Sequence, residues 1–521
     1  MESILDMTKA RKYSGGETVF TESVGEYTLP DYLPEMRKLL RIETRLLPTG
    51  QYVGNNRVEM TGTTVHTVIY SDGEGRLSSA VLNGDYRFAV PLSAEGDVQV
   101  LVESRPERVS YRLGGPRRLS IRTGISSNVR LLPETVVGGE ELPDKTEGFE
   151  RLMGVETVCD IRRVYGEGVT LDDQCRLDGL RPDEVRSVAG DATVFVREAR
   201  PQVDGIYCSG EVWAKVLYVS ETGDSEFPET VWRKIPFDVM IPDAAGAGNA
   251  LVRGYCTSFD VDAEDDGLGN CQLIIRMQLD FEGASYTNRE IAYVRDMYAR
   301  HAHESLVRES FPLARFHGCA TQNFTVSGST PMEEAWAGAR AVDAFVTPEN
   351  MVLEAGDNRV KISGDCRVEA ILRLPSVDGE GTPQYERAEF VFPVKMELDG
   401  KVTVPEGADV PFSCNFLGGQ MRLDGQSLRM DGEMAVSLAV LEPKTVTTVT
   451  KAETVEGEET GRSAGDVIVA YPDSGETLWS VAKRYRADLQ KLMQFNQIPE
   501  RFTEEPDAPS SIDGMSSLLI C

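Results

Sequence analysis

Two histidines placed two positions apart are the residues of this chain best suited to bind a metal ion. His301 and His303 would put two imidazoles on one face of a β-strand, and Glu304 follows directly. A tetrahedral zinc site needs at least three protein ligands, and the sequence offers no evident third one. We therefore interpret the pair as ordinary strand side chains and predict no metal site.

A histidine near a cysteine and a run of carboxylates are the other candidates for chemistry. His317 and Cys319 could supply a base and a thiol nucleophile, but residues two apart on a strand share a face without forming a buried dyad. We expect a loop there. The acidic run 262–270 is rich in oxygen ligands but lacks the glutamate spacing of an EF-hand, so we expect an acidic hairpin loop.

Sequence motifs of the common enzyme classes are missing from this chain. It contains no GxxxxGK[ST] loop, no GxSxG elbow, no HExxH helix and no CxxC pair. We therefore predict a protein without enzymatic activity and without a cofactor.

The strongly acidic composition argues against nucleic acid as a partner. The chain of 521 residues carries 54 Lys and Arg against 84 Asp and Glu, a formal net charge of −30, whereas nucleic-acid-binding proteins need a basic footprint. No stretch of eighteen apolar residues occurs, so we expect no membrane span. The first ten residues lack the apolar segment of a secretory signal, and the nine cysteines are scattered. These features favour a cytoplasmic protein with reduced thiols.

Three segments with the same alternation of apolar residues surround Gly62, Gly210 and Gly364. At even distances from each glycine the residues are mostly apolar, and we expect the alternate positions, including Thr67, Lys215 and Glu369, to face water. This pattern is typical of half-buried antiparallel strands. We also expect each glycine to mark a bulge or a close backbone approach.

The wide spacing of these segments makes each repeat a whole domain. Further shared strands begin at Phe88, Phe237 and Phe392 and at Leu119, Leu273 and Leu428. We predict a mostly β protein with three tandem related β-sandwich-like domains followed by a small βααβ domain. The expected boundaries are 1–150 with an N-terminal lead-in, 151–306, 307–443, a flexible linker at 444–466, and 467–521.

The C-terminal residues predict two short helices with defined starting points. In the segment from Gly475 to Tyr485, the residues Leu478, Val481, Ala482 and Tyr485 form one apolar helical stripe. Thr477 is a plausible N-cap of the first helix, and Asp488 of a second one with Leu492 on its inner side. Leu518, Leu519 and Ile520 would form a returning strand.

This segment, with its Gly-Glu-Thr-Leu-Trp start and Asn496, resembles the LysM domain, a βααβ module that binds N-acetylglucosamine polymers or, in some lineages, proteins. The resemblance implies a glycan groove between the turn before the first helix and the loop after the second. The matching residues are Gly475, Glu476, Thr477 and Leu478 on one side, and Asn496, Gln497 and Ile498 on the other.

Charged residues around the LysM-like segment bear on its ligand. The residues 500–511 form a longer and more acidic connection than is usual, which disfavours anionic wall polymers. Lys483, Arg484 and Arg486 give the first helix a basic face. This face is either a solvated helix surface or a site that binds a protein with an acidic rim.

The order of the segments is similar to that of a known family. Repeated strands ending in tyrosine (Tyr70, Tyr218), the lead-in Leu29-Pro30-Asp31 and the LysM-like end resemble the SpoIVA-interacting (SipL-type) spore-coat morphogenetic proteins. The resemblance implies a non-enzymatic scaffold in the mother-cell cytosol. Its LysM domain would dock on a SpoIVA-like coat assembly ATPase at the forespore surface, together with other coat proteins.

Two functions therefore remain open. One is a cytoplasmic assembly scaffold whose LysM domain binds a protein. The other is a cell-wall protein that binds peptidoglycan or chitin fragments through the LysM groove.

Overall fold

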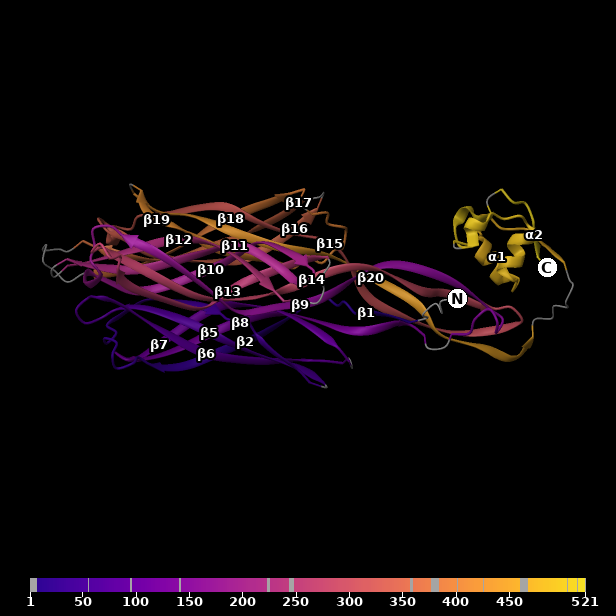
Figure 1. Cartoon of the computed structure of the whole chain (residues 1–521), viewed down its shortest axis with the longest axis horizontal. Helices are drawn as coiled ribbons and strands as arrows, with labels where there is room; N and C mark the ends of the chain where they lie inside the picture. The colour runs from indigo at the N-terminus through magenta and orange to yellow at the C-terminus, as the bar shows by residue number, and fades with distance from the viewer. Residues whose placement is uncertain are drawn as a thin grey trace.

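Long antiparallel strands make up most of the computed structural model of this chain. The structure describes residues 7–520, except for positions 55, 94–95, 140–141, 223–224, 243–247, 357–358, 376–383, 401, 425, 460–466, 504 and 513. Figure 1 shows an elongated molecule with a bundle of strands at one end and a small helical module at the other.

Three groups of six strands follow one another along the chain in the same order. Group 1 comprises β2 (Glu17–Thr28), β3 (Lys38–Leu46), β5 (Arg57–Ser71), β6 (Leu77–Pro91), β7 (Val98–Gly115) and β8 (Arg118–Gly138), with the extra strands β1 (Met7–Arg11) and β4 (Gly50–Val53). Group 2 comprises β9 (Phe149–Leu177), β10 (Val185–Gln202), β11 (Gly205–Thr222), β12 (Ser225–Ile241), β13 (Asn249–Asp265) and β14 (Cys271–Ala299). Group 3 comprises β15 (Ala302–Pro331), β16 (Arg340–Gly356), β17 (Arg359–Leu374), β18 (Gln384–Asp399), β19 (Phe412–Asp424) and β20 (Ser427–Glu459).

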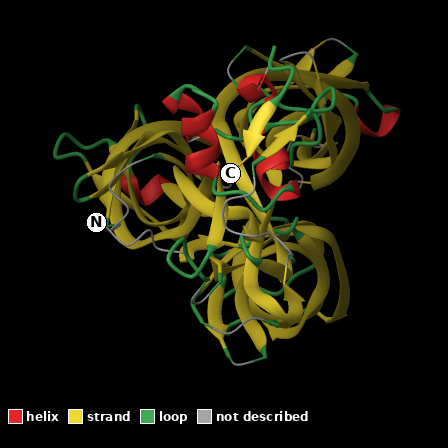
Figure 2. Cartoon of the chain, turned by 90° about the vertical axis from the view of Figure 1, so that its right-hand side faces the viewer, coloured by secondary structure: helices red, strands yellow, loops and turns green. Residues whose placement is uncertain are grey.

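Each group pairs its strands in the same two sheets. In the first sheet β5, β11 and β17 lie between their sequence neighbours, and in the second sheet β8, β14 and β20 lie between the first and the fifth strand of the group. Apolar side chains between the two sheets form the group cores. Viewed along the long axis, the strands of the groups curve into rounded bundles around that axis (Figure 2).

The three glycines singled out in the sequence lie in equivalent strands. Gly62, Gly210 and Gly364 occupy the central strands β5, β11 and β17. Opposite each glycine, the hydrogen-bonded pairing with the preceding strand is interrupted. In group 1 this strand is interrupted between β3 and β4, and in groups 2 and 3 the register shifts in β10 and β16. A Cβ on Gly210 would lie 1.9 Å from the Phe195 carbonyl oxygen. The expectation of a bulge or a close backbone approach is confirmed.

The second face of the central strands is not exposed to water, contrary to our expectation. Thr67 and Lys215 are buried, and Glu369 is half-buried. These strand faces meet at the junction of the three groups, where Lys215 of β11 contacts Glu43 of β3 and Asp343 of β16 at 3.1 Å each. Arg41 of β3 also pairs with Glu43 and Asp343. Alternation of apolar and polar residues along a strand shows that the two faces of the sheet differ. It does not show whether another sheet packs on the polar face.

The expected boundaries and linker differ from the structure. Residues 150, 306 and 443 lie inside β9, β15 and β20, and residues 444–459, expected in a flexible linker, belong to β20 and pair with β15. Val446 and Val449 of this segment are buried, and its threonines suit a strand. Residues 460–466 lie outside the described part. His317 and Cys319, expected in a loop, also lie in β15.

The ends of the longest strands form a stalk between the groups and the C-terminal module. We define the stalk as β1 with residues 134–138 of β8, residues 149–160 of β9 with 287–299 of β14, and residues 302–317 of β15 with 440–459 of β20. Apolar side chains of all three ribbons pack together inside it: Ala10, Val137, Val158, Ile291, Phe311, Leu313 and Val446. Further along, Leu142, Phe149, Val294 and Met297 continue this core. The stalk therefore has its own hydrophobic interior.

Candidate functional site

The C-terminal module has the βααβ order that the sequence predicts. β21 (Ile468–Ala470) pairs with β22 (Leu518–Ile520), and α1 (Leu478–Arg484) and α2 (Leu489–Phe495) lie between them in sequence. The Thr477 hydroxyl accepts a hydrogen bond from the Ser480 amide at 3.2 Å, and the Asp488 carboxylate accepts one from the Lys491 amide at 3.1 Å. Both predicted N-caps are thus confirmed.

Most residues on the first side of the expected glycan groove make contacts with other residues of the module. Gly475 is exposed with a φ of 87°, which favours glycine. The Glu476 carboxylate accepts a hydrogen bond from the Asp473 amide at 2.8 Å and pairs with Arg484 at 3.0 Å. Thr477 caps α1, and Leu478 is completely buried.

Two of the three residues on the second side of the expected groove hold the module together. The Asn496 side chain donates to the Leu519 carbonyl and accepts from the Leu519 amide, both at 2.7 Å, which fixes β22 against the end of α2. Ile498 is buried in the module core. Gln497 is exposed with a φ of 55°, a left-handed conformation that closes α2.

The segment after α2 covers the start of α1. The Trp479 amide donates to the Pro506 carbonyl at 2.9 Å, and the Leu478 amide donates to the Ser511 hydroxyl at 2.9 Å. The Thr477 hydroxyl lies 3.3 Å from the Asp507 carboxylate. The free amides at a helix N-terminus are the groups that would bind a ligand oxygen, and here the chain's own residues occupy them.

Trp479 lies at the contact between the module and the stalk, which we call the seat of the module. Its indole is buried and packs on Tyr298 of β14, with ring centroids 5.0 Å apart. The Tyr298 hydroxyl donates to the Ala487 carbonyl at 2.7 Å, between the two helices. Leu152 of β9 joins the same apolar cluster. The sequence predicted Trp479 as a core residue of the module, and the structure adds the stalk as half of its surroundings.

Charged groups surround this aromatic contact. Asp296 of β14 accepts hydrogen bonds from the Trp479 indole at 3.0 Å and from the Lys483 ammonium at 2.7 Å. Arg300 pairs with Asp488 at 2.7 Å. Arg295 pairs with Asp507 at 2.7 Å.

The basic face expected on the first helix is mostly turned toward the stalk. Arg486 donates to the Ala299 carbonyl at 2.9 Å and pairs with Glu304, and it also donates to His303 Nδ1 at 2.9 Å. Lys483 pairs with Asp296 as described. Arg484 is the more exposed residue of the three and pairs with Glu476. The expectation of an open basic face is therefore corrected, because these cations meet carboxylates of the same chain.

The pKa values in this seat reflect its ion pairs. Burial alone would raise the pKa of Asp296, but hydrogen bonds from Lys483 and Trp479 lower it overall. The pKa of Asp488 is also lowered, because the Lys491 amide and Arg300 outweigh its burial. By contrast, burial raises the pKa of Glu150, which lies beside Arg300.

We predict that the module is released from the stalk in acid. Because the folded-state pKa of Asp296 and of Asp488 is lowered, their contribution is complete above about pH 4 and is lost as the pH falls through the folded-state values. Hydrogen exchange of β22 and α1 against pH should report the loss. In the Asp296→Asn variant the contact should be weakened at neutral pH and should change less in acid. An identical acid profile in that variant would contradict the assignment.

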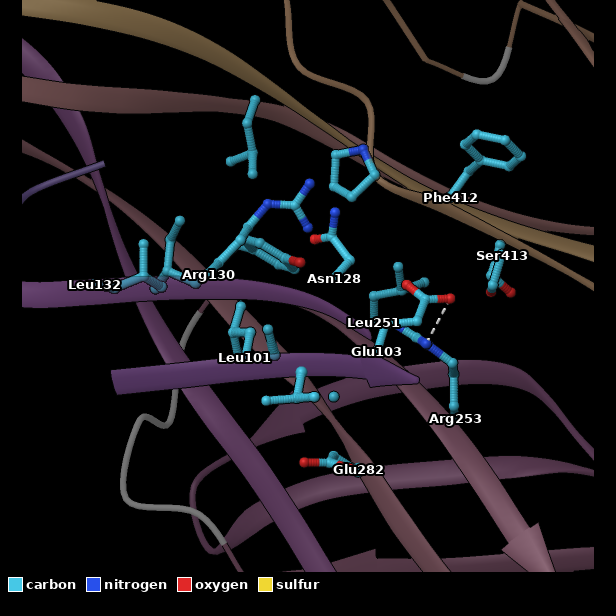
Figure 3. A pocket seen from close by; sticks show the side chains of 18 of the residues that line it. Leu101, Glu103, Asn128, Arg130, Leu132, Leu251, Arg253, Glu282, Phe412 and Ser413 are labelled. Carbon is cyan, nitrogen blue, oxygen red and sulfur yellow. Dashed lines mark ion pairs between the residues drawn. The ribbon is translucent and has the colours of Figure 1, made fainter. Parts of the chain in front are cut away.

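A small cavity lies where the three groups meet (Figure 3). Its volume is about 50 Å³. It is lined by polar groups from every group, and Glu103 pairs with Arg253 at 2.8 Å across it. Beside it, Arg130 lies 3.4 Å from Asp409. Such a volume holds a few water molecules and is far below that of pockets for organic ligands.

No metal-binding cluster of three or more His, Cys, Asp or Glu residues occurs in the part of the chain that the structure describes. His303 instead accepts the hydrogen bond from Arg486 described above. His317 pairs with Glu442 at 2.7 Å across β15 and β20. Within the same described residues, no helix is long and apolar enough to cross a membrane.

The geometry of the C-terminal module, two capped helices between two paired strands, defines a small βααβ fold. A comparison with protein families identifies it: the model of the LysM domain matches residues 473–501. The chain therefore carries a LysM domain, a class of domain associated with binding of peptidoglycan or other glycans. No curated protein and no solved structure matches the chain.

Proposed function

We propose that the protein is a non-enzymatic cytoplasmic scaffold that holds its LysM domain at the end of a β stalk to dock on a partner protein. The observation that carries this proposal is the covered start of α1, where the Trp479 amide donates to the Pro506 carbonyl and the Leu478 amide donates to the Ser511 hydroxyl. With these two amides bonded within the chain, the start of α1 has fewer donors to offer a sugar. The fixed seat on the stalk, in contrast, suits a domain whose orientation matters to an assembly.

The three strand groups support the scaffold role. Their shared strand order and the equivalent positions of the three glycines favour three related domains. Together with the LysM domain, this order resembles the SipL-type spore-coat morphogenetic proteins. We accordingly propose a SpoIVA-like coat assembly ATPase as the partner of the LysM domain, other coat proteins as further partners, and the mother-cell side of the forespore surface as the location.

The location of a fluorescently tagged chain in sporulating cells tests this proposal. We expect a shell around the forespore that depends on the coat assembly ATPase. Purified full-length chain should also bind that ATPase, and a variant lacking residues 467–521 should not. A uniform distribution, or a location in the cell wall, would refute the proposal.

Glycan binding is the second candidate, favoured by the LysM family match itself. Isothermal titration of the full chain with a tetramer of N-acetylglucosamine separates the two functions. We expect no heat of binding at micromolar concentration. Micromolar binding that is lost when the exposed Gln497 is changed would favour a wall-binding role instead.

A further inference from the structure

An arginine-rich hairpin stands out on the surface of this acidic chain. Residues 105–122, the end of β7 and the start of β8, contain six arginines and one glutamate, in a chain of net charge −30. The other two groups place an equivalent hairpin at the same point of their fold, between β13 and β14 and between β19 and β20. The fold itself therefore does not require these arginines.

Four of the arginines share one face of the sheet. Arg108 and Arg112 lie four residues apart on β7, and Arg118 and Arg122 lie four residues apart on β8. Arg112 lies opposite Ser120, whose alternation places it on the same face as Arg118 and Arg122. All four side chains are exposed. Within the described residues, the side chains of Arg108, Arg112 and Arg118 make no hydrogen bond or ion pair, so their charge is available to a partner.

Exposed apolar side chains lie on the opposite face of this hairpin and in a neighbouring loop. Tyr111 and Leu113, on the other side of the same hairpin, are 45% and 44% exposed. Tyr32 is 84% exposed, and Arg117 holds its loop against the hairpin by donating to the Leu33 carbonyl at 3.1 Å. The hairpin therefore offers arginines on one face and exposed apolar groups on the other.

The equivalent hairpin of group 2 has the opposite charge. Residues 260–270 contain no lysine or arginine and five carboxylates: Asp260, Asp262, Glu264, Asp265 and Asp266. Arg276 of β14 pairs with Asp262 and Glu264, but one arginine does not balance five carboxylates. Asp262 and Glu264 remain 61% and 54% exposed, and Leu268 at the tip is 78% exposed. In group 3 the same hairpin is balanced, since Arg422 and Arg429 both pair with Asp431.

Both charged hairpins lie at the end of the molecule away from the LysM domain. β8 runs from Arg118 at its hairpin to Gly138 in the stalk, and β14 runs from Cys271 at its hairpin to Ala299 beside the LysM domain. Figure 1 shows the stalk and the LysM domain at the opposite end from the free ends of these hairpins. One end of the molecule thus presents a basic and an acidic surface together.

We propose that two copies of the chain associate through this end, with the basic hairpin of each copy on the acidic hairpin of the other. A two-fold axis makes both contacts equal and closes the assembly as a dimer. An anionic lipid surface fits this end less well, because the acidic hairpin would face the same headgroups within a Debye length of about 8 Å.

This inference extends the scaffold role but does not depend on which ligand the LysM domain binds. Sedimentation equilibrium of the full chain tests it, without any LysM ligand. We expect dimers at low salt and a dissociation constant that rises at least about tenfold at high salt, because charge pairs at an exposed surface are screened. Monomers at every salt concentration would overturn the proposal, and so would binding to anionic vesicles through this hairpin.

Charge reversal supplies the specific control. Changing Arg108, Arg112 and Arg118 to Glu turns residues 105–122 from six Arg and one Glu into three Arg and four Glu, so both hairpins are then acidic. Changing Asp260, Asp262 and Glu264 to Lys turns residues 260–270 from five carboxylates into two carboxylates and three Lys, so both hairpins are then basic. Each triple variant should therefore be monomeric alone. An equimolar mixture of the two should form heterodimers, because both contacts are again between opposite charges. The matched change Arg422→Glu with Arg429→Glu, on the balanced hairpin, should leave the dimer intact. Dimers in either single preparation, or no association in the mixture, would refute the proposed interface.

Discussion

The Lys215→Met variant is expected to lose about 3–5 kcal/mol of unfolding free energy, because the change leaves a buried carboxylate without its cation. Arg41, Glu43, Lys215 and Asp343 are all nearly inaccessible to solvent, with side-chain exposures of 1%, 6%, 6% and 2%. Two cations and two anions balance one another there, and each strand group contributes at least one of them. Without Lys215, Glu43 and Asp343 share Arg41 alone.

Chemical denaturation of the full chain measures this loss of unfolding free energy. Two further variants serve as a compensating change and as a control. Lys215→Met combined with Glu43→Gln restores a neutral cluster and should recover part of the lost free energy. Lys451→Met removes a lysine that pairs with Glu453 at 63% exposure, so it should change stability by less than about 1 kcal/mol. Equal effects of Lys215→Met and Lys451→Met would show that the buried charges do not join the groups.

Acid should weaken the same junction. Burial raises the pKa of Asp343, but Lys215 and Arg41 lower it more, so the folded-state pKa lies below that of an unfolded aspartate. The stabilisation is therefore present at neutral pH and is lost as the pH falls below about 4.

The Trp479→Ala variant is expected to detach the LysM domain from the stalk. A buried tryptophan typically contributes about 3–5 kcal/mol relative to alanine. Here the indole packs on Tyr298 and donates to Asp296, so much of that contribution belongs to the contact with the stalk. Leu478, Val481 and Leu492 remain to form the core of the domain.

Limited proteolysis separates detachment from unfolding. We expect faster cleavage between the stalk and residue 467 in Trp479→Ala, with residues 467–521 released as a resistant fragment. Phe495→Ala is the matched control, because this aromatic of the same domain is 53% exposed and should leave the cleavage rate unchanged. Degradation of the LysM fragment itself would show instead that the indole holds the domain core.

Local patterns in the sequence predicted the features that depend on neighbouring residues. The alternation around Gly62, Gly210 and Gly364 identified equivalent strands, and Thr477 and Asp488 identified the helix starts. A side chain's hydrogen bond to an amide three residues away is encoded locally, so the sequence suffices for it. The family resemblance added the identity of the C-terminal domain.

Contacts between distant segments could not be predicted in the same way. The alternation of apolar and polar residues in β11 predicts that Lys215 faces water. Lys215 is buried only because the three strand groups pack against one another. Lys483 and Arg486 form a basic helix face whose partners, Asp296 and Glu304, are almost two hundred residues away in sequence. The end of β20 has the composition of a linker, and its pairing with β15 becomes apparent only from the stalk.

The stalk also determines how the molecule would respond to a pulling force. A pull on the LysM domain along the long axis acts on β20, which precedes the domain in the chain, and on β14 through the contact of Tyr298 with Trp479. The hydrogen bonds of these strands to β15 and β9 run across the direction of the strands. All bonds of a ribbon then carry the force at once and must slide together, whereas a pull across the strands would open them one after another. We therefore expect the stalk to resist a pull along its axis more strongly than a pull across its strands.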